Sequence, residues 1–258
     1  MTKTALITGA TTGIGREIAA AFARDGVNLI LVARDQAALN ERVLEWRDQF
    51  GIEIATFACD LAVPGAADEL ADLVSARGAP IDYLVNNAGV GVYGTFDQTS
   101  LRDELAMITL NVVTPTVLCK RFLPQLMQRN GKILNVASIA AFQPGPYMAA
   151  YYATKAYLLN FSDALAAELA GSGVTVTTFC PGPTASGFQL RAAMQASRLV
   201  KGKTLADAAS VGIAGYRAMQ RGKRVVVPGW TNRLTTLITK FLPRAAVTRA
   251  IYRMSAPA

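Results

Sequence analysis

Short, uninterrupted apolar runs alternate along this chain with longer segments whose apolar residues recur every three to four positions. The short runs have the length of buried strands, and the longer segments have the period of amphipathic helices. The expected strands lie at 5–8, 27–33, 53–58, 81–85, 132–137, 174–179 and 224–227. The expected helices lie near 16–25, 36–50, 65–77, 101–129, 150–171 and 204–221.

This alternation of strands and helices predicts the fold class. It is typical of a parallel sheet that carries helices on both faces, and strands covered on both faces read as continuous apolar runs. Neither a linker rich in Pro or Ser nor an internal repeat divides the chain. We therefore expect an α/β fold of the Rossmann type, with a doubly wound parallel sheet of about seven strands. Residues 1–229 form its single domain, and residues 230–258 form an extension that is not an independent domain.

Composition narrows the classes of protein. Hydrophobic residues make up 52% of the 258 positions, enough to bury a large core. No apolar run is long enough to span a bilayer, and the N-terminus lacks the features of a signal peptide. We therefore expect a cytoplasmic protein.

Histidine is absent from the chain. Its absence excludes catalytic arrangements built on His and metal sites with His ligands. The three cysteines are far apart and form no Cys-x-x-Cys pair, which argues against a disulfide framework or a thiolate metal cage. We expect no metal site, and we expect proton transfer to fall to Asp, Glu, Lys, Tyr or a chain of water molecules.

The net charge of +8 is unevenly distributed. Residues 169–258 hold 13 Lys or Arg and a single acid, Asp207, whereas residues 1–168 hold 13 basic and 17 acidic residues. A basic C-terminal third favours anionic cofactors, acidic membranes or nucleic acid. No nucleic-acid recognition motif accompanies the charge, so we expect no nucleic-acid partner.

A glycine-rich segment follows the first expected strand and precedes a helical pattern. Glycines at such a turn let the backbone approach a pyrophosphate closely, and the helix N-terminus offers free N–H groups to the phosphates. The spacing Gly-x-x-x-Gly-x-Gly differs from the commoner Gly-x-Gly-x-x-Gly, and no Gly-Lys-Ser/Thr of a Walker loop follows. The expected phosphate-binding residues are Gly9, Thr11, Thr12, Gly13, Ile14 and Gly15.

The second expected strand ends at Ala33, Arg34 and Asp35. Here a dinucleotide fold recognises the adenosine ribose, either through an acid that binds the 2′-hydroxyl or through an Arg that accommodates a 2′-phosphate. Ala33 has no group for a hydroxyl and Arg34 follows it, which favours NADP. Asp35 keeps NAD as the alternative, because a small backbone shift would bring its carboxylate inward.

Polar residues also follow the third and fourth expected strands. The carboxyl ends of parallel strands form the ligand crevice of an open sheet, so these residues lie on the same rim as the glycine loop. We expect them to line the cofactor site. They are Asp60 and Leu61 after the third strand, and Asn87, Ala88 and Gly89 after the fourth.

Ser138 ends the fifth expected strand, and Tyr151 and Lys155 follow at the start of a long helical segment. Tyr151 and Lys155 are spaced i and i+4, so they share one helix face. A phenol is a weak base at neutral pH, and a nearby ammonium lowers its pKa. Tyr151 is therefore a candidate to exchange a proton with a carbonyl or alcohol oxygen.

These motifs, in this order and at these intervals, resemble those of the short-chain dehydrogenase/reductase family over roughly residues 4–230. The motifs are Thr-Gly-x-x-x-Gly-x-Gly at 8–15, Asn-Asn-Ala-Gly at 86–89, Asn111, Ser138, Tyr-x-x-x-Lys at 151–155 and Pro181-Gly182.

The resemblance implies a role for each matching position. Tyr151 is the general acid/base, Lys155 lowers its pKa and binds the nicotinamide ribose, and Ser138 holds the substrate oxygen. Asn111 kinks its helix and holds a water that joins Lys155 to solvent. Pro181 and Gly182 belong to the cofactor site, as does a hydroxyl that meets the nicotinamide carboxamide. The family pattern Pro-Gly-x-x-x-Thr places Ser186 there, but Thr184 lies two residues earlier, so both remain candidates.

The implied function is an NADP(H)-dependent oxidoreductase that interconverts a ketone or aldehyde and an alcohol. An NAD-dependent alcohol dehydrogenase with the same site is one alternative, and a dinucleotide-binding regulator without turnover is another. The segment 183–205 is expected to cover the substrate pocket. Its residues Ala185, Phe188, Leu190 and Met194 indicate an apolar substrate, Tyr147 is a further candidate for the pocket wall, and Tyr152 is expected to pack elsewhere.

The C-terminal extension has an apolar stripe of helical period, with basic residues between and after its members. Pro243 is expected to break the helix. The stripe either binds a membrane surface or packs on protein, and we favour packing on the same subunit or on a partner in a homodimer or homotetramer. The stripe is Leu234, Leu237, Ile238, Phe241 and Leu242, and the basic residues are Arg233, Lys240, Arg244, Arg249 and Arg253.

Overall fold

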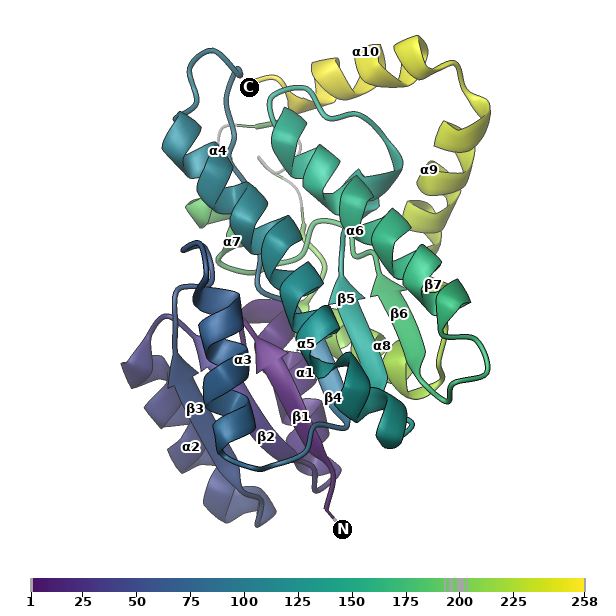
Figure 1. Cartoon of the computed structure of the whole chain (residues 1–258). Coiled ribbons are helices and arrows are strands. Elements are labelled where there is room, and N and C mark those ends of the chain that lie inside the picture. The colour runs from purple at the N-terminus through teal and green to yellow at the C-terminus, as the bar shows by residue number, and fades with distance from the viewer. Residues whose placement is uncertain (1, 193, 195–196, 199–201, 203, 258) are drawn as a thin grey trace.

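Seven parallel strands form a single sheet in the order β3-β2-β1-β4-β5-β6-β7 (Figure 1). The structure is a computed structural model that describes residues 2–192, 194, 197–198, 202 and 204–257. The predicted doubly wound α/β fold is confirmed. The strands are β1 (Thr4–Thr8), β2 (Asn28–Ala33), β3 (Ile54–Ala58), β4 (Tyr83–Asn86), β5 (Lys132–Val136), β6 (Thr175–Phe179) and β7 (Val225–Val226).

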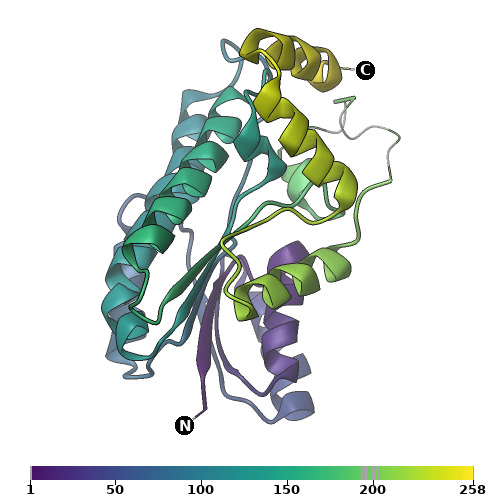
Figure 2. The same ribbon diagram turned by 90° about the vertical axis from the view of Figure 1, so that its right-hand side faces the viewer.

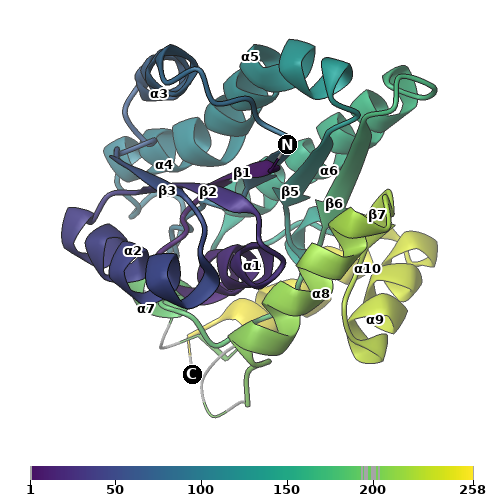
Figure 3. The same cartoon turned by 90° about the horizontal axis from the view of Figure 1, so that it is seen from below.

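Helices cover the sheet on both faces, as the view along it shows (Figure 3). Strand residues alternate between two cores: Ile7 faces one and its neighbour Leu6 faces the other. This double burial explains why the strands read as continuous apolar runs. One face carries α1 (Gly13–Arg24), α2 (Gln36–Phe50) and α8 (Ala208–Gln220), and the other carries α3 (Ala66–Ala76), α5 (Thr114–Gln128) and α6 (Ala149–Glu168).

The single helix expected at 101–129 contains an irregular turn. It consists of α4 (Leu101–Ile108), a π-helical turn at Thr109–Val113, and α5. Asn111 lies in the π-helical turn, and such turns are frequent at functional sites. The expected change of helix geometry at this residue is therefore present, as a π-helical turn.

The expectation that no segment can span a bilayer was too strict. The helical run Leu101–Gln128 has the length and, with a mean hydropathy of 1.2, the composition of a membrane span. The core helix of an α/β protein meets the same two criteria. Here Leu118, Phe122 and Leu126 are buried in one of the two cores, which accounts for the apolar composition.

Two C-terminal helices, α9 (Trp230–Phe241) and α10 (Arg244–Ser255), form an arm at the carboxyl ends of β5 and β6 (Figures 1 and 2). Pro243 separates the two helices, as the sequence predicts, and it is the N-terminal cap of α10.

The end of α10 is anchored to the body of the same chain. The Tyr93 hydroxyl donates to the Ser255 carbonyl at 2.6 Å, and the backbone N–H of Arg198 donates to the Ala256 carbonyl at 3.2 Å. The Tyr147 ring packs between Tyr93 and Tyr252, at centroid distances of 5.9 and 5.2 Å. Tyr147 is therefore part of this anchor, and the expectation that it lines the substrate pocket is wrong.

Candidate active site

A cavity of about 770 Å³ lies at the carboxyl edge of the sheet. That volume is within the usual range for small-molecule and cofactor sites. The cavity is lined by the glycine loop, by the ends of β2 to β5, by the start of α6, by the segment after β6 and by the C-terminal helices. The carboxyl-edge position predicted for the site is thus the position of this cavity.

The glycine loop brings the backbone close to the cavity. Gly9 and Gly13 have φ values of +65° and +56°, in the region that favours glycine, and both line the cavity with Thr11, Thr12 and Ile14. Gly15 is buried beneath the loop instead, where a Cβ would lie 2.2 Å from Asn87 Nδ2 and 2.3 Å from the Gly9 carbonyl oxygen. A cradle without side chains at the start of α1 fits the pyrophosphate of a dinucleotide.

Asn87 holds this loop in place. Its Nδ2 donates to the Thr8 carbonyl at 2.9 Å and to the Gly9 carbonyl at 3.1 Å. The Thr8 hydroxyl accepts from the backbone N–H groups of Asn87 and Ala88, both at 3.0 Å. Asn87, Ala88 and Gly89 all line the cavity, so one segment both shapes the loop and forms part of the wall.

The end of β2 separates Arg34 from Asp35. Arg34 is exposed and lines the cavity together with Ala33. The Asp35 carboxylate accepts from the backbone N–H of Ala38 at 3.1 Å and caps α2, and Asp35 does not line the cavity. Of these two charged residues, Arg34 thus lies at this end of the cavity and Asp35 does not.

Asp60 and Leu61 line the cavity beyond β3. The Asp60 carboxylate accepts from the backbone N–H of Ala62 at 3.1 Å, which fixes a turn. The Leu61 carbonyl accepts from the Thr114 hydroxyl at 2.8 Å, which ties this turn to α5. The turn is therefore held rigidly at the rim where the adenine end of a dinucleotide would lie.

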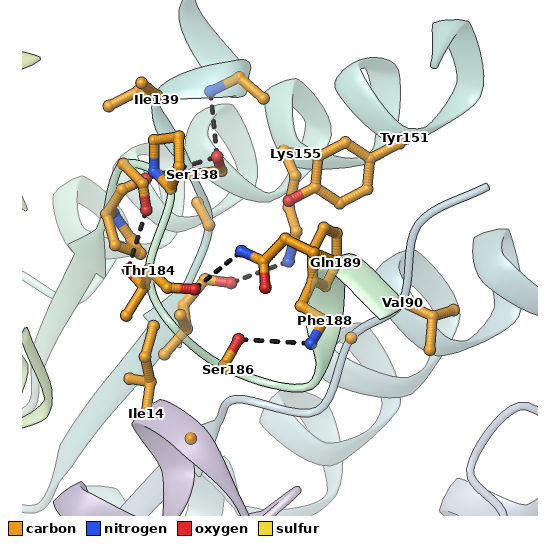
Figure 4. Close-up of a pocket in the computed structure, with 18 of the residues that line it drawn as sticks. Ile14, Val90, Ser138, Ile139, Tyr151, Lys155, Thr184, Ser186, Phe188 and Gln189 are labelled. Carbon is orange, nitrogen blue, oxygen red and sulfur yellow. Dashed lines mark hydrogen bonds between the residues drawn. The ribbon is translucent and has the colours of Figure 1, made fainter. Parts of the chain in front are cut away.

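Ser138, Tyr151 and Lys155 meet at the centre of the cavity (Figure 4). Tyr151 and Lys155 project from the first turns of α6, and Ser138 lies just beyond β5. The Lys155 ammonium donates to the Val136 carbonyl at 3.0 Å and lies 5.9 Å from the centroid of the Tyr151 ring. The Ser138 hydroxyl accepts from the backbone N–H of Ala140 at 3.1 Å.

The environment of these groups shifts their pKa values in opposite directions. Burial raises the pKa of Tyr151, and a hydrogen bond with Ser138 lowers it by less. Burial lowers the pKa of Lys155 to about 8. Burial is the largest effect on the pKa of Tyr151, and the expected lowering of this pKa by Lys155 stays a prediction. Tyr151 is therefore protonated at neutral pH and ready to donate.

Asn111 lies behind the cavity wall and does not line it. Its side chain accepts from the Val90 N–H at 3.1 Å, donates to the Val90 carbonyl at 2.9 Å, and donates to the Thr154 hydroxyl at 3.1 Å. A Cβ at Gly89 would lie 3.2 Å from Asn111 Oδ1 and 3.3 Å from Lys155 Nζ. Asn111 thus positions the Gly89–Val90 segment beside Lys155.

The segment after β6 closes one side of the cavity. Pro181, Gly182, Thr184 and Ser186 all line it. The Thr184 hydroxyl donates to the Gly182 carbonyl at 2.9 Å, whereas the Ser186 hydroxyl accepts from the Phe188 N–H at 3.4 Å. Among the residues that the structure describes, Ser186 donates to no acceptor, so its proton is available to a ligand, and Thr184 and Ser186 both stay candidates for the carboxamide contact.

The C-terminal helices supply a wall that sequence reasoning missed. The residues of α9 that face the cavity are Thr and Asn, spaced about one helical turn apart. This spacing is the signal in the sequence that could have identified them. Gln143, Met148 and Gln189 from other segments were missed as well. The residues from the extension are Thr231, Asn232, Thr235, Thr239, Leu242, Val247, Ala250, Ile251 and Met254.

The expectations for five residues at the substrate end have different outcomes. Phe188 and Met194 line the cavity, but Ala185 and Leu190 do not. Both are exposed, because they lie on the outer side of the segment. Tyr152, expected only to pack, is buried and also lines the cavity. Part of the segment 183–205, at positions 193, 195–196, 199–201 and 203, lies outside the described residues.

Replacing Lys155 by methionine is expected to change how stability depends on pH. A lysine ordinarily titrates near 10.5, so between about pH 8 and 10.5 the unfolded chain binds more protons than the folded protein at this site. Lys155 therefore destabilises the folded protein at low pH, and this destabilisation disappears as the pH rises through the window. Below it, burying the cation costs about 3 kcal/mol, a cost that Lys155→Met removes.

Urea denaturation of both proteins from about pH 7 to about pH 10 measures this effect. Lys155→Met should be more stable than the native protein at the lowest pH. This gain in the free energy of unfolding should shrink as the pH rises. Cys180 is the exception among the other groups, because the Lys155 charge lowers the pKa of its buried thiol. The comparison is therefore made with Cys180→Ala in both proteins. A difference independent of pH would show that Lys155 is not a destabilised buried cation.

Comparison with known proteins places this arrangement in a family. Residues 3–196 match the family model described as short chain dehydrogenase. Ketoacyl reductase HetN of Nostoc sp. (strain PCC 7120) is 30% identical over 93% of this chain and 83% of its own length. Probable oxidoreductase EphD of Mycobacterium tuberculosis is 37% identical over 68% of this chain, but that match spans 30% of the length of EphD.

Solved structures agree with these matches. A short-chain dehydrogenase from Sphingobium yanoikuyae in complex with NADPH superposes with a TM-score of 0.83 at 30% sequence identity, over 94% of this chain and 97% of the other. The family match covers the glycine loop, the strand ends and the pair Tyr151 and Lys155. The chain therefore belongs to the short-chain dehydrogenase family.

Proposed function

We propose that this chain reduces an apolar ketone or aldehyde with NADPH, and that it catalyses the reverse oxidation of the alcohol with NADP. One observation carries the choice of cofactor. At the end of β2 the Arg34 side chain lies at the cavity, whereas the Asp35 carboxylate is engaged in capping α2. A guanidinium at this point suits a 2′-phosphate, and an engaged carboxylate is less available to a 2′-hydroxyl.

The residues at the centre of the cavity supply the proton chemistry. The cofactor, when bound, supplies or accepts the hydride. Tyr151 donates its proton to the substrate oxygen during reduction, which suits a phenol whose pKa is raised by burial. Ser138 lies beside Tyr151 and hydrogen-bonds the same substrate oxygen. Lys155, positively charged at neutral pH, stabilises the phenolate that remains.

The substrate end of the cavity favours an apolar compound. Tyr151 packs there in a cluster with Met148, Tyr152 and Met194, and its ring centroid lies 5.4 Å from that of Phe188. Val247 and Ile251 of α10 line the cavity too. Apolar walls around a few polar groups are typical of pockets for hydrophobic small molecules.

Two relatives support parts of this proposal. The Sphingobium yanoikuyae enzyme, similar over nearly the whole chain, was solved with NADPH. HetN, which the chain also resembles over most of its length, is named as a ketoacyl reductase. An acyl chain next to a ketone is the kind of substrate that an apolar pocket accommodates.

Replacing Arg34 by alanine is expected to weaken NADPH binding roughly 10-fold to 100-fold, because a charge-assisted hydrogen bond to the 2′-phosphate is lost. The affinity for NADH should change by less than about twofold, since NADH has no such phosphate. Titration of the cofactor fluorescence measures both dissociation constants.

The variant Asp35→Asn is the matched control, because Asn also caps helices well. It is expected to leave both dissociation constants unchanged. Equal affinity of the native protein for NADPH and NADH, or a selective loss of NADH binding in Asp35→Asn, would contradict the NADP assignment and support the NAD-dependent alternative.

A further inference from the structure

The helix α9 carries a large apolar face that is open to solvent. Trp230 is 75% exposed and Phe241 is 79% exposed, and the residues between them on this face are about half exposed. Contiguous apolar patches on a protein surface usually mark an interaction site. The face, called here the α9 face, consists of Trp230, Leu234, Leu237, Ile238 and Phe241.

The polar side of this helix, not the apolar side, is turned toward the protein. Thr231, Thr235 and Thr239 line the cavity, and Thr236 is buried. An amphipathic helix at a protein surface normally has the reverse orientation, with its apolar stripe on the core. The α9 face is therefore not the buried side of a helix packed on its own subunit.

The charge around the α9 face is positive. Arg233 and Lys240 lie on α9, Arg244 begins α10, and Arg249 and Arg253 follow on α10. All five are exposed, and in the part of the chain that the structure describes none of them forms an ion pair. No acidic residue follows Asp207 in the sequence. A partner for this surface is therefore expected to carry negative charge.

The α9 face is also continuous with the mouth of the cavity. Leu242, directly after α9, is about half exposed and also lines the cavity. Met254 on α10 has the same two properties. Apolar side chains thus link the outer face of the arm to the lining of the cavity.

We propose that the α9 face docks on an anionic lipid bilayer, with the mouth of the cavity opening toward the lipid. Apolar side chains that enter the interface, together with nearby Lys and Arg, are what binding to an anionic membrane surface requires. A second copy of the chain fits this surface less well. A two-fold contact through α9 would bring Arg233 and Lys240 of both copies together, and like charges at an interface oppose association.

Co-sedimentation of the full chain with vesicles tests the proposal without reference to the reaction. Vesicles of phosphatidylglycerol and phosphatidylcholine should bind the protein at low salt, and binding should weaken as salt is added. Vesicles of phosphatidylcholine alone should bind far less. Tryptophan emission gives a second signal, because Trp230 lies on the α9 face and the other tryptophan, Trp46, is 2% exposed. Anionic vesicles should shift the emission to the blue.

Variants separate the two contributions. Leu237→Ser with Phe241→Ser should lower vesicle binding at least about tenfold. Lys240→Gln with Arg244→Gln should lower it by roughly fivefold for each residue. The double variant Leu44→Ser with Leu73→Ser removes two exposed leucines elsewhere and should bind like the native protein. Trp230→Phe should still sediment with vesicles but lose the blue shift.

Two results would overturn the proposal. One is the absence of binding to anionic vesicles at low salt. The other is a change of oligomeric state in light scattering, with an oligomeric native protein and a monomeric double variant Leu237→Ser with Phe241→Ser. The α9 face would then be a subunit interface. The serine variants lie outside the cavity lining, so they should reduce a short, water-soluble carbonyl compound at the native rate. Loss of vesicle binding is thereby distinguished from loss of activity.

Discussion

Replacing Tyr151 by phenylalanine is expected to lower turnover by at least about 100-fold, while the affinity for NADPH stays within about twofold of the native value. The hydroxyl is the proposed proton donor at the centre of the cavity. The glycine loop expected to hold the phosphates and Lys155, expected to hold the nicotinamide ribose, are unchanged in this variant. Steady-state rates with a carbonyl substrate, together with a fluorescence titration of NADPH, measure the two effects separately.

Tyr152→Phe is the matched control for this experiment. Tyr152 follows Tyr151 on α6, is buried to the same degree and lines the same cavity. Loss of its hydroxyl should lower turnover less than about tenfold, because it is not the proton donor. Retention of more than about a tenth of the native activity in Tyr151→Phe would show that another group protonates the substrate.

The second large effect is expected at the glycine loop. A methyl group at Gly15 cannot fit without moving the Gly9 carbonyl or Asn87, which lie within 2.3 Å of its Cβ position. We expect Gly15→Ala to lower the free energy of unfolding by about 1–3 kcal/mol. The displaced loop should also weaken NADPH binding at least about tenfold, because its N–H groups no longer point at the phosphates.

Gly26→Ala is the control that separates the effect of backbone strain from disruption of the phosphate-binding glycine loop. Gly26 has a φ of +70° and nothing within 4 Å of its Cβ position. Its substitution should cost about 1–2 kcal/mol of stability through backbone strain alone, with NADPH affinity unchanged. Thermal melts and cofactor titrations of both variants give the comparison. A Gly15→Ala protein that binds NADPH normally would contradict the assignment of the phosphate loop.

The sheet was predictable because its strands are buried on both faces. Residues such as Leu6 and Ile7 belong to different cores, so the whole strand is apolar and stands out from the helices. The site was predictable for a related reason. Parallel strands bring their carboxyl ends to one edge, so the residues after β1, β2, β4 and β5 meet there however far apart they are in sequence.

The contribution of the C-terminal helices was not predictable in the same way. Periodicity shows that a helix has an apolar face, but it does not show which face is buried. In α9 the polar face with Thr235 and Thr239 lines the cavity, and the apolar face with Phe241 is exposed. The prediction that Tyr147 lines the pocket failed for a similar reason. It rested on the position of Tyr147 one turn before Tyr151, but its ring packs with Tyr252 instead.

The behaviour of Tyr151 also depended on tertiary structure. The i, i+4 spacing to Lys155 indicates a shared helix face but not the distance between the reactive atoms. The Lys155 ammonium is engaged by the Val136 carbonyl, and both side chains are buried. Burial is therefore the largest effect on the pKa of each group, and residue spacing alone does not reveal it.

The most direct test of the account is a screen of apolar ketones and aldehydes with NADPH, read by loss of nicotinamide absorbance and by identification of the product. We expect NADPH to be oxidised in equal amount to the alcohol formed, and we expect Tyr151→Phe to abolish both signals while still binding NADPH. Tight binding of NADPH without reduction of any carbonyl compound, and without oxidation of any alcohol by NADP, would contradict the account and favour a dinucleotide-binding regulator.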